Sequence, residues 1–168
     1  FSSEGEVLLQ IGEEGIDEGK FNGPSGIAVS KDGLIYVSDQ LNSRIQVFDK
    51  DGKFLKSIKS SDLPNPEGLT FDNEDNLWVV EAKNCKIFKL DKDGNILFSF
   101  GGKGGEDNQF VYPFDVEVKG DFVYVVDRGL GAPINPCIKK FDKEGNFILK
   151  IGTKGAQVPL KHGEFLTP

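Results

Sequence analysis

The chain has 168 residues and a net charge of −7 at pH 7, with 27 acidic and 20 basic side chains. This length suits one domain with its own core, whereas the acidic excess argues against a nucleic-acid-binding surface, which needs clustered cations. No apolar run is long enough to cross a membrane as a helix, and the two cysteines are too few for a disulfide framework.

An eleven-residue phrase occurs four times along the chain, as FSSEGEVLLQI, FDKDGKFLKSI, LDKDGNILFSF and FDKEGNFILKI. Its shared glycine falls at positions 5, 52, 94 and 145, a spacing of 42 to 51 residues. A period in this range indicates a repeat architecture. Three complete units follow the first phrase, and they begin at Pro24, Pro66 and Pro113.

Each unit has the pattern of four short strands. In the first unit, GIAV, LIYV, RIQVF and KFLKSI are rich in β-branched and aromatic residues, and turn residues separate them. The turns SKDG and DKDG end in glycine, which a tight turn favours at its fourth position, and such short connections suit only antiparallel neighbours. Each unit is therefore predicted to be a four-stranded antiparallel meander.

The inner strands are apolar on both faces, as in LWVV and FVYVV, which is typical of strands covered on both sides. Because we expect no helix longer than one turn, neighbouring units must provide the cover, and a meander stacked on its own copies is a propeller blade. The sequence thus predicts an all-β fold, a β-propeller arc of three four-stranded antiparallel blades plus one extra outer strand at Val7–Ile11. The expected parts are residues 1–23 (this strand of a preceding blade, and a linker), 24–65 (blade 1), 66–112 (blade 2) and 113–168 (blade 3 and the start of the next linker).

The first unit, GPSGIAVSKDGLIYVSDQLNSRIQVFDKDGKFLKSI, resembles an NHL repeat, with its P-x-G-I-A-V entry, I-Y-V-x-D second strand and N-x-R-I-x-V-F third strand. The segment IGEEGIDEGKFNGP is similar to the glycine-rich linker of that family. Blade 2 departs from the pattern at Glu81 and Lys86, and blade 3 at Asp115 and in five extra residues before Phe141. The resemblance implies a propeller of six blades used mostly for binding, and it alone favours an extracellular or periplasmic location over the cytoplasm.

Propellers close with about four to eight blades, so three blades predict an excerpt of a longer propeller. A dimer of two such chains would supply six blades but would leave the strand at Val7–Ile11 without a blade to complete. We expect the remaining propeller blades or another chain to cover the apolar blade faces at the two ends of the arc.

The long, irregular segments fall at one end of the predicted arc, because the linkers between blades and the turns between second and third strands share that end. The tight SKDG and DKDG turns occupy the other end. Since recognition residues concentrate on loops held by a rigid scaffold, we expect the long-loop end to bind a partner. The candidate binding residues are Asp39, Gln40, Asn42, Arg44, Glu67, Glu81, Lys83, Lys86, Asp115, Asp127 and Arg128.

Structural roles compete with binding for several of these residues. Asp39 and Asn42 would cap a turn, with Arg44 paired to a neighbouring carboxylate. Glu67 and Asp115, just inside the first strands, would either face the mouth of the central channel for a ligand or remain solvated carboxylates at its rim.

Charge reversal separates the binding and structural interpretations. If the long-loop end binds, reversal at Arg44, Lys83 or Arg128 weakens binding with little loss of stability. Reversal at the tight-turn end leaves binding unchanged, and the matched residues there are Lys50, Lys92 and Lys143.

The sequence offers no catalytic set. Propellers related to the NHL family include lyases that hold zinc with several histidines and lactone hydrolases that hold calcium, but a single histidine, His162, cannot form a three-ligand zinc site. Cys85 and Cys137 have no adjacent histidine to activate a thiol, and a blade spacing near 10 Å predicts that both are free. We therefore predict no catalytic residue, metal or cofactor. The alternative is part of a metal-dependent lyase or lactone hydrolase whose catalytic residues lie in other blades.

A binding module for a protein or a small ligand is thus the predicted function. The resemblance raises the question of RNA binding, because some NHL propellers of animals bind RNA through a basic face. With 20 basic and 27 acidic side chains, this chain does not supply such a face. We expect no nucleic-acid partner and no membrane segment in this chain.

Overall fold

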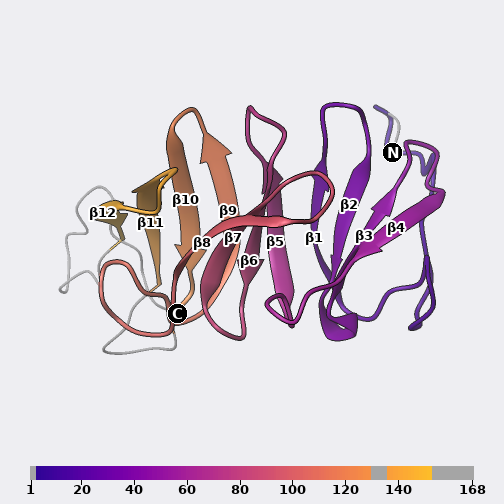
Figure 1. The fold of residues 1–168 in the computed structure, drawn as a ribbon. Helices are drawn as coiled ribbons and strands as arrows, with labels where there is room; N and C mark the ends of the chain where they lie inside the picture. The colour runs from indigo at the N-terminus through magenta and orange to yellow at the C-terminus, as the bar shows by residue number, and fades with distance from the viewer. Residues whose placement is uncertain (1–2, 130–135, 153–168) are drawn as a thin grey trace.

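A computed structural model of the chain describes residues 3–129 and 136–152, which form twelve β-strands in three four-stranded sheets (Figure 1). Neighbouring strands in each sheet are consecutive and antiparallel. Blade 1 consists of β1 (Pro24–Val29), β2 (Ile35–Asp39), β3 (Arg44–Phe48) and β4 (Phe54–Ile58), with a 3-10 turn, η1 (Gln40–Asn42), between β2 and β3. Blade 2 consists of β5 (Pro66–Phe71), β6 (Leu77–Glu81), β7 (Lys86–Leu90) and β8 (Ile96–Gly101). Blade 3 consists of β9 (Pro113–Lys119), β10 (Phe122–Asp127), β11 (Cys137–Asp142) and β12 (Phe147–Ile151).

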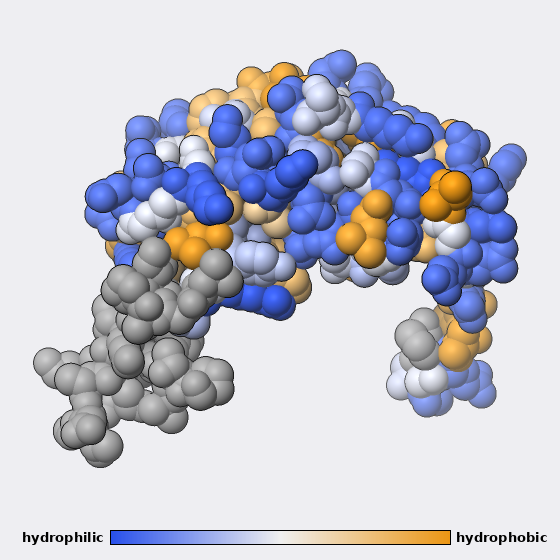
Figure 2. Space-filling view, turned by 90° about the horizontal axis from the view of Figure 1, so that it is seen from below, coloured by the Kyte–Doolittle hydropathy of each residue, from blue (hydrophilic) through white to orange (hydrophobic). Residues whose placement is uncertain are grey.

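The prediction of an all-β propeller arc is confirmed. The three blades stand side by side in chain order, with β1 next to β5 and β5 next to β9 on the inner side (Figure 1). Seen from below, they form an arch whose concave side is open (Figure 2). Within the described ranges, η1 is the only helical element, and no helix is long and apolar enough to cross a membrane.

The repeated DKDG or DKEG motif forms the hairpin between the third and fourth strands. In blade 1 the N–H of Gly52 donates to the carbonyl of Asp49 at 3.0 Å, and the Asp49 carboxylate accepts the N–H groups of Asp51 and Lys53. Gly52 has a φ of 80°, and the turn glycines of blades 2 and 3 also have positive φ. An added Cβ at each would lie 2.8 or 2.9 Å from a side chain that ends the preceding copy of the phrase, namely Ile11, Ile58 or Phe100. The repeated glycine therefore serves both the turn and the contact between blades.

Replacing the turn glycine Gly94 by valine is expected to destabilise the fold. Gly94 has a φ of 95°, and a Cβ there would lie 2.8 Å from Ile58. The left-handed backbone alone costs about 1 kcal/mol for a residue with a Cβ, and the clash adds to it. Gly33→Val is the matched control, because Gly33 also has a positive φ but open space around it. Urea unfolding should show a larger loss for Gly94→Val, and equal losses would contradict the blade contact.

The expected outer strand at Val7–Ile11 is where the structure differs from the sequence pattern, because none of these residues belongs to a strand. A strand requires a hydrogen-bonded neighbour, and the structure places no strand beside this segment among the described residues. Leu9 and Ile11 nevertheless lie close to Gly52, within 3.1 and 2.9 Å of the position of an added Cβ. The segment thus contacts the turn of blade 1 as Ile58 contacts the turn of blade 2, but it forms no β-ladder with the described residues.

The core consists of two apolar layers between the blades. Tyr36, Ile45 and Leu69 are among the residues of the layer between blades 1 and 2, and Trp78 and Phe141 belong to the layer between blades 2 and 3. Each layer combines one face of one blade with the opposite face of the next, so the periodicity of the repeat matches that of the core.

The outer faces of the two end blades are uncovered. Ile27 in β1 is 66% exposed, although Leu69, at the same place in β5, is 6% exposed. At the other end of the arc, Phe122 and Val126 are exposed on blade 3. These exposed apolar positions leave both end faces available for packing against another surface.

Candidate functional site

The linkers and the turns between second and third strands meet at one end of the arc, as expected from the repeat. The carboxylates of Asp39, Glu81 and Asp127 end the second strands of the three blades. Asp39 accepts the N–H of Asn22, and Asp127 accepts the N–H groups of Val111 and Tyr112, so both hold the preceding linker. Glu81 instead accepts the N–H groups of residues 83 and 84 in its own turn. All three carboxylates are buried and stabilise the loops.

Arg44 is the main correction to the candidate binding residues. Its side chain is 3% exposed, and its Nε donates to Asp39 Oδ2 at 2.7 Å. A terminal nitrogen donates to the carbonyls of Asp17 and Lys20 in the linker, at 2.7 and 2.8 Å. Asn42 donates to the same Asp39 oxygen at 2.9 Å. The capping alternative therefore describes Asp39, Asn42 and Arg44, and reversal at Arg44 would disturb the fold instead of reporting binding alone.

Two residues that hold linkers in place, one in blade 1 and one in blade 3, were not identified from the sequence. Gln46 donates to Lys20 O and to Asp39 Oδ2, at 2.6 and 3.1 Å. Lys139, at the same place in blade 3, donates to the linker carbonyls of Glu106 and Gln109. Burial lowers the pKa of the Lys139 amine. An alignment of the repeats could have identified these two residues, because Gln46 in β3 and Lys139 in β11 occupy the same position of the third strand and both contact a linker.

The remaining candidates are divided between exposed and buried positions. Lys83, Asp115 and Arg128 are exposed, and Gln40 and Lys86 are partly exposed. Glu67 is buried, at 2% exposure.

We call one end of the arc the long-loop face. It is formed by the described parts of the linkers (12–23, 59–65 and 102–112) and by the turns at 40–43, 82–85 and 128–129. Seen from below, the arch is largely hydrophilic, with separate hydrophobic patches (Figure 2).

Five side chains from the three blades lie together on the inner side of the arc, and we call them the concave-edge cluster: Gln40, Glu67, Phe114, Asp115 and Arg128. Gln40 Nε2 donates a hydrogen bond to Glu67 Oε1. The guanidinium carbon of Arg128 lies 3.4 Å from the centre of the Phe114 ring. Burial raises the pKa of the Glu67 carboxyl, and the charge of Arg128 acts in the opposite direction. Partial desolvation by neighbouring residues also raises the pKa of the Asp115 carboxyl, although the residue is exposed.

Glycines bring the inner strands close enough for this cluster to form. A Cβ at Gly26 would lie 2.3 Å from the carbonyl oxygen of Glu67, and a Cβ at Gly68 would lie 2.5 Å from Asp115 Oδ1. A cavity of about 230 Å³ adjoins the cluster, and its lining includes Gly68, Phe114 and Asp115. The sequence predicted that Glu67 and Asp115 lie near the channel, but it did not reveal the Arg128–Phe114 stack.

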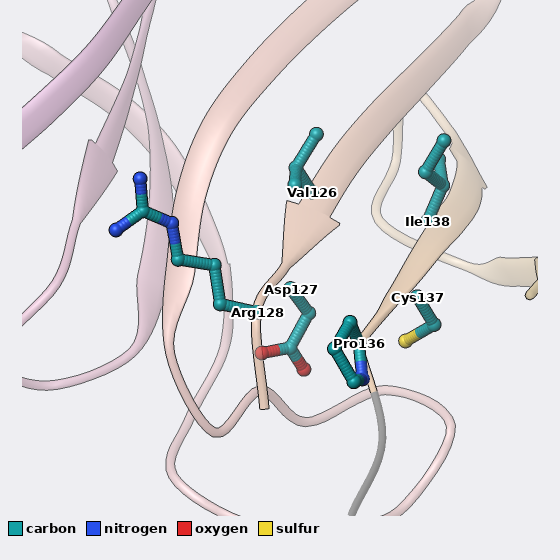
Figure 3. Close-up of a pocket in the computed structure, with 6 residues that line it drawn as sticks. All are labelled: Val126, Asp127, Arg128, Pro136, Cys137 and Ile138. Carbon is teal, nitrogen blue, oxygen red and sulfur yellow. The ribbon is translucent and has the colours of Figure 1, made fainter. Parts of the chain in front are cut away.

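A second cavity of about 200 Å³ lies at the C-terminal end of β10 (Figure 3). Its lining residues are Val126, Asp127, Arg128, Pro136, Cys137 and Ile138. The Arg128 guanidinium points away from the other five residues, toward the inner strands (Figure 3). Burial raises the pKa of the Cys137 thiol, so this cysteine is not an activated nucleophile. Cys85 and Cys137 are both free thiols, as predicted.

The described residues contain no group of three or more His, Cys, Asp or Glu side chains placed to hold a metal ion. His162 lies outside the described residues, as does most of the enlarged loop before Cys137.

The sheets and their arrangement define the chain as an arc of a β-propeller. Among solved structures, it is similar to a catalytically inactive virginiamycin B lyase from Staphylococcus aureus with quinupristin, with a TM-score of 0.60 and 22% identity over 79% of this chain and 41% of that one. It is also similar to the hydrazine synthase of Kuenenia stuttgartiensis, with a TM-score of 0.60 and 20% identity over 76% of this chain and 36% of that one. Both likenesses concern the fold alone.

Residues 21–48 match the model of the NHL repeat. A segment of 45 residues, which is 27% of this chain, is 56% identical to the B-box type zinc finger protein ncl-1 of Caenorhabditis elegans. The chain is also 29% identical, over 153 positions and 89% of its length, to the protein brain tumor of Drosophila melanogaster. It spans 5% and 10% of these two relatives. The chain therefore contains an NHL repeat at residues 21–48, within an arc of a β-propeller.

Proposed function

We propose that the chain is an NHL-type propeller scaffold that binds a protein partner through its long-loop face. The observation that carries this proposal is a pair of exposed apolar side chains on that face. Ile16 in the first linker is 74% exposed, and Leu41 in η1 is 64% exposed. Large apolar side chains presented on a surface are typical of protein-binding sites.

The loops that carry these side chains are held firmly in place. The N–H of Leu41 donates to the carbonyl of Asn22, and Asn42 donates to the carbonyl of Gly15, both at 3.0 Å. Together with the Arg44 network, these bonds join η1 to the linker that contains Ile16. A rigid apolar surface loses little conformational freedom on association. This favours binding over catalysis, for which the described residues supply no activated nucleophile.

Charge reversal and apolar truncation test this proposal. Peptides selected from a displayed library against the whole chain should lose about tenfold or more in affinity with Leu41→Ser, Lys83→Glu or Arg128→Glu, because these residues are exposed on the long-loop face. Lys50→Glu and Lys92→Glu at the tight turns should leave affinity unchanged. Lys143 is not a clean control, because its amine pairs with Glu74 and its side chain is 17% exposed.

Unfolding midpoints of all five variants should stay close to that of the parent chain, since none of these residues is buried. Loss of affinity with the tight-turn variants and not with the long-loop variants would show that the binding face is the opposite one. Binders that are indifferent to both sets would contradict the proposal.

A further inference from the structure

We propose that the concave-edge cluster is a subsite for an acidic side chain of a peptide segment, with Arg128 as the residue that binds its carboxylate. This inference rests on the proposed function, because Gln40 and Arg128 of the cluster belong to the long-loop face and the inference assigns a ligand chemistry to Arg128.

The Arg128 side chain is positioned by an aromatic ring. Its guanidinium lies 3.4 Å from the centre of the Phe114 ring and 5.9 Å from that of Tyr112. Within the described ranges, this guanidinium makes no hydrogen bond and no ion pair, although the backbone N–H of Arg128 donates to Tyr112 O. Stacking fixes the plane of the guanidinium and leaves its N–H edge available, and this edge matches a carboxylate with two parallel hydrogen bonds.

The contrast with Arg44 shows why Arg128 is a candidate for binding. Arg44 is buried and donates hydrogen bonds to Asp39 and to two linker carbonyls. Arg128 is exposed and follows Asp127, whose carboxylate is already committed to linker N–H groups. The side chain turns away from that carboxylate (Figure 3). The fold therefore leaves this cation without an anionic partner among the described residues.

The neighbouring groups select the kind of anion. Glu67 acts on Arg128 electrostatically but forms no ion pair with it, and Asp115 adjoins the same cavity. A single carboxylate with adjacent N–H donors satisfies both signs of charge, since the cation takes the carboxylate and the exposed carboxylate of Asp115 accepts a donor. A peptide segment has this chemistry around each of its acidic residues.

A nucleic acid fits these residues less well. Phosphate binding relies on several clustered cations, whereas here one cation lies beside two carboxyl groups. Base stacking requires an open aromatic face, and Arg128 covers a face of the Phe114 ring. The concave-edge cluster thus favours a peptide.

The test uses nuclear magnetic resonance on the full chain with three probes: acetyl-Gly-Glu-Gly-Gly-amide, the same peptide with glutamine in place of glutamate, and a ten-nucleotide oligouridine. The glutamate peptide should shift the Nε–H resonance of Arg128 in a saturable manner, and the other two probes should not. Arg128→Gln should abolish the saturable shifts of neighbouring amides. Arg128→Lys should weaken binding about tenfold, because it keeps the charge but loses the two-point hydrogen bonding. Lys50→Gln is the control and should bind as the parent does.

Any one of four outcomes would overturn the assignment. These are equal shifts with the glutamine peptide, saturable shifts with oligouridine alone, retained binding in Arg128→Gln, and no binding of the glutamate peptide. The outcome is separable from that of the proposed function. If selected peptides depend on Leu41 and Lys83 but not on Arg128, the long-loop face is a binding face and this subsite is wrong. If they depend on none of the three, the proposed function itself fails.

Discussion

Replacing Asp39 by alanine is expected to lower the free energy of unfolding by about 3 to 5 kcal/mol, which is the usual effect of breaking a buried ion pair by removing one partner. Asp39 is fully buried, and one of its oxygens accepts hydrogen bonds from Asn42, Arg44 and Gln46. The substitution leaves the Arg44 guanidinium buried without its carboxylate and releases the N–H of Asn22 in the linker. Urea unfolding measures the loss.

Glu81→Ala is the matched control. Glu81 occupies the same place in blade 2, and it too is buried. Among the described residues, however, it accepts only two backbone N–H groups of its turn and pairs with no buried cation. Its removal should cost less, about 1 to 3 kcal/mol for the unsatisfied groups. Equal losses at the two positions would show that the Asp39–Arg44 pair contributes no more than a turn cap.

Replacing Trp78 by alanine is expected to cost about 3 to 5 kcal/mol, as large truncations in a core do. Trp78 is fully buried in the layer between blades 2 and 3. Its Nε1 donates to Asp72 Oδ2 at 3.0 Å, and the Lys89 amine lies 5.5 Å from its ring centre. The substitution opens a cavity between two blades and removes a donor from a buried carboxylate. Guanidinium unfolding measures the loss.

Trp78→Phe separates the hydrogen bond from the packing. Burial alone would raise the pKa of Asp72, but hydrogen bonds from Trp78, Asn76 and Glu74 outweigh it and hold the pKa at about 2. A carboxyl pKa that is lowered on folding stabilises the protein above the unfolded value near 3.8, and this stability is lost as pH falls toward 2. The parent chain should lose about 2 kcal/mol from this group over that range, and Trp78→Phe should lose less. An unchanged pH dependence would show that the indole donor does not determine the pKa.

The repeat and the strand pattern were sufficient for the fold. The phrase around Gly52, Gly94 and Gly145 predicted three hairpins in register, and the apolar inner strands predicted that blades cover one another. The expected strand at Val7–Ile11 was the exception. Its residue types are those of a strand, but a strand also needs a hydrogen-bonded neighbour, which the pattern of a single segment does not supply.

The candidate site was predicted less completely, because the same residue types serve a fold and a ligand. Asp39 and Arg44 have the charges of a binding pair, yet the structure buries them against a linker about 20 residues away in sequence. Glu67 was expected near the channel, and its hydrogen bond to Gln40 depends on the approach of blade 2 to blade 1.

The sequence by itself determined the repeat, the strand order and the end of the arc where the long loops lie, because these follow from local periodicity and turn chemistry. Only the tertiary structure decided which charged side chains are free. Arg44 begins the third strand of blade 1 and Arg128 follows the second strand of blade 3, and their charge alone does not show which of them is free to bind a ligand. Arg44 is surrounded by the linker carbonyls that precede its blade, so its desolvation is offset by hydrogen bonds, whereas Arg128 stacks on Phe114 at the open edge and keeps its donors exposed. Exposure is a property of the packing between blades, and no single repeat contains that information.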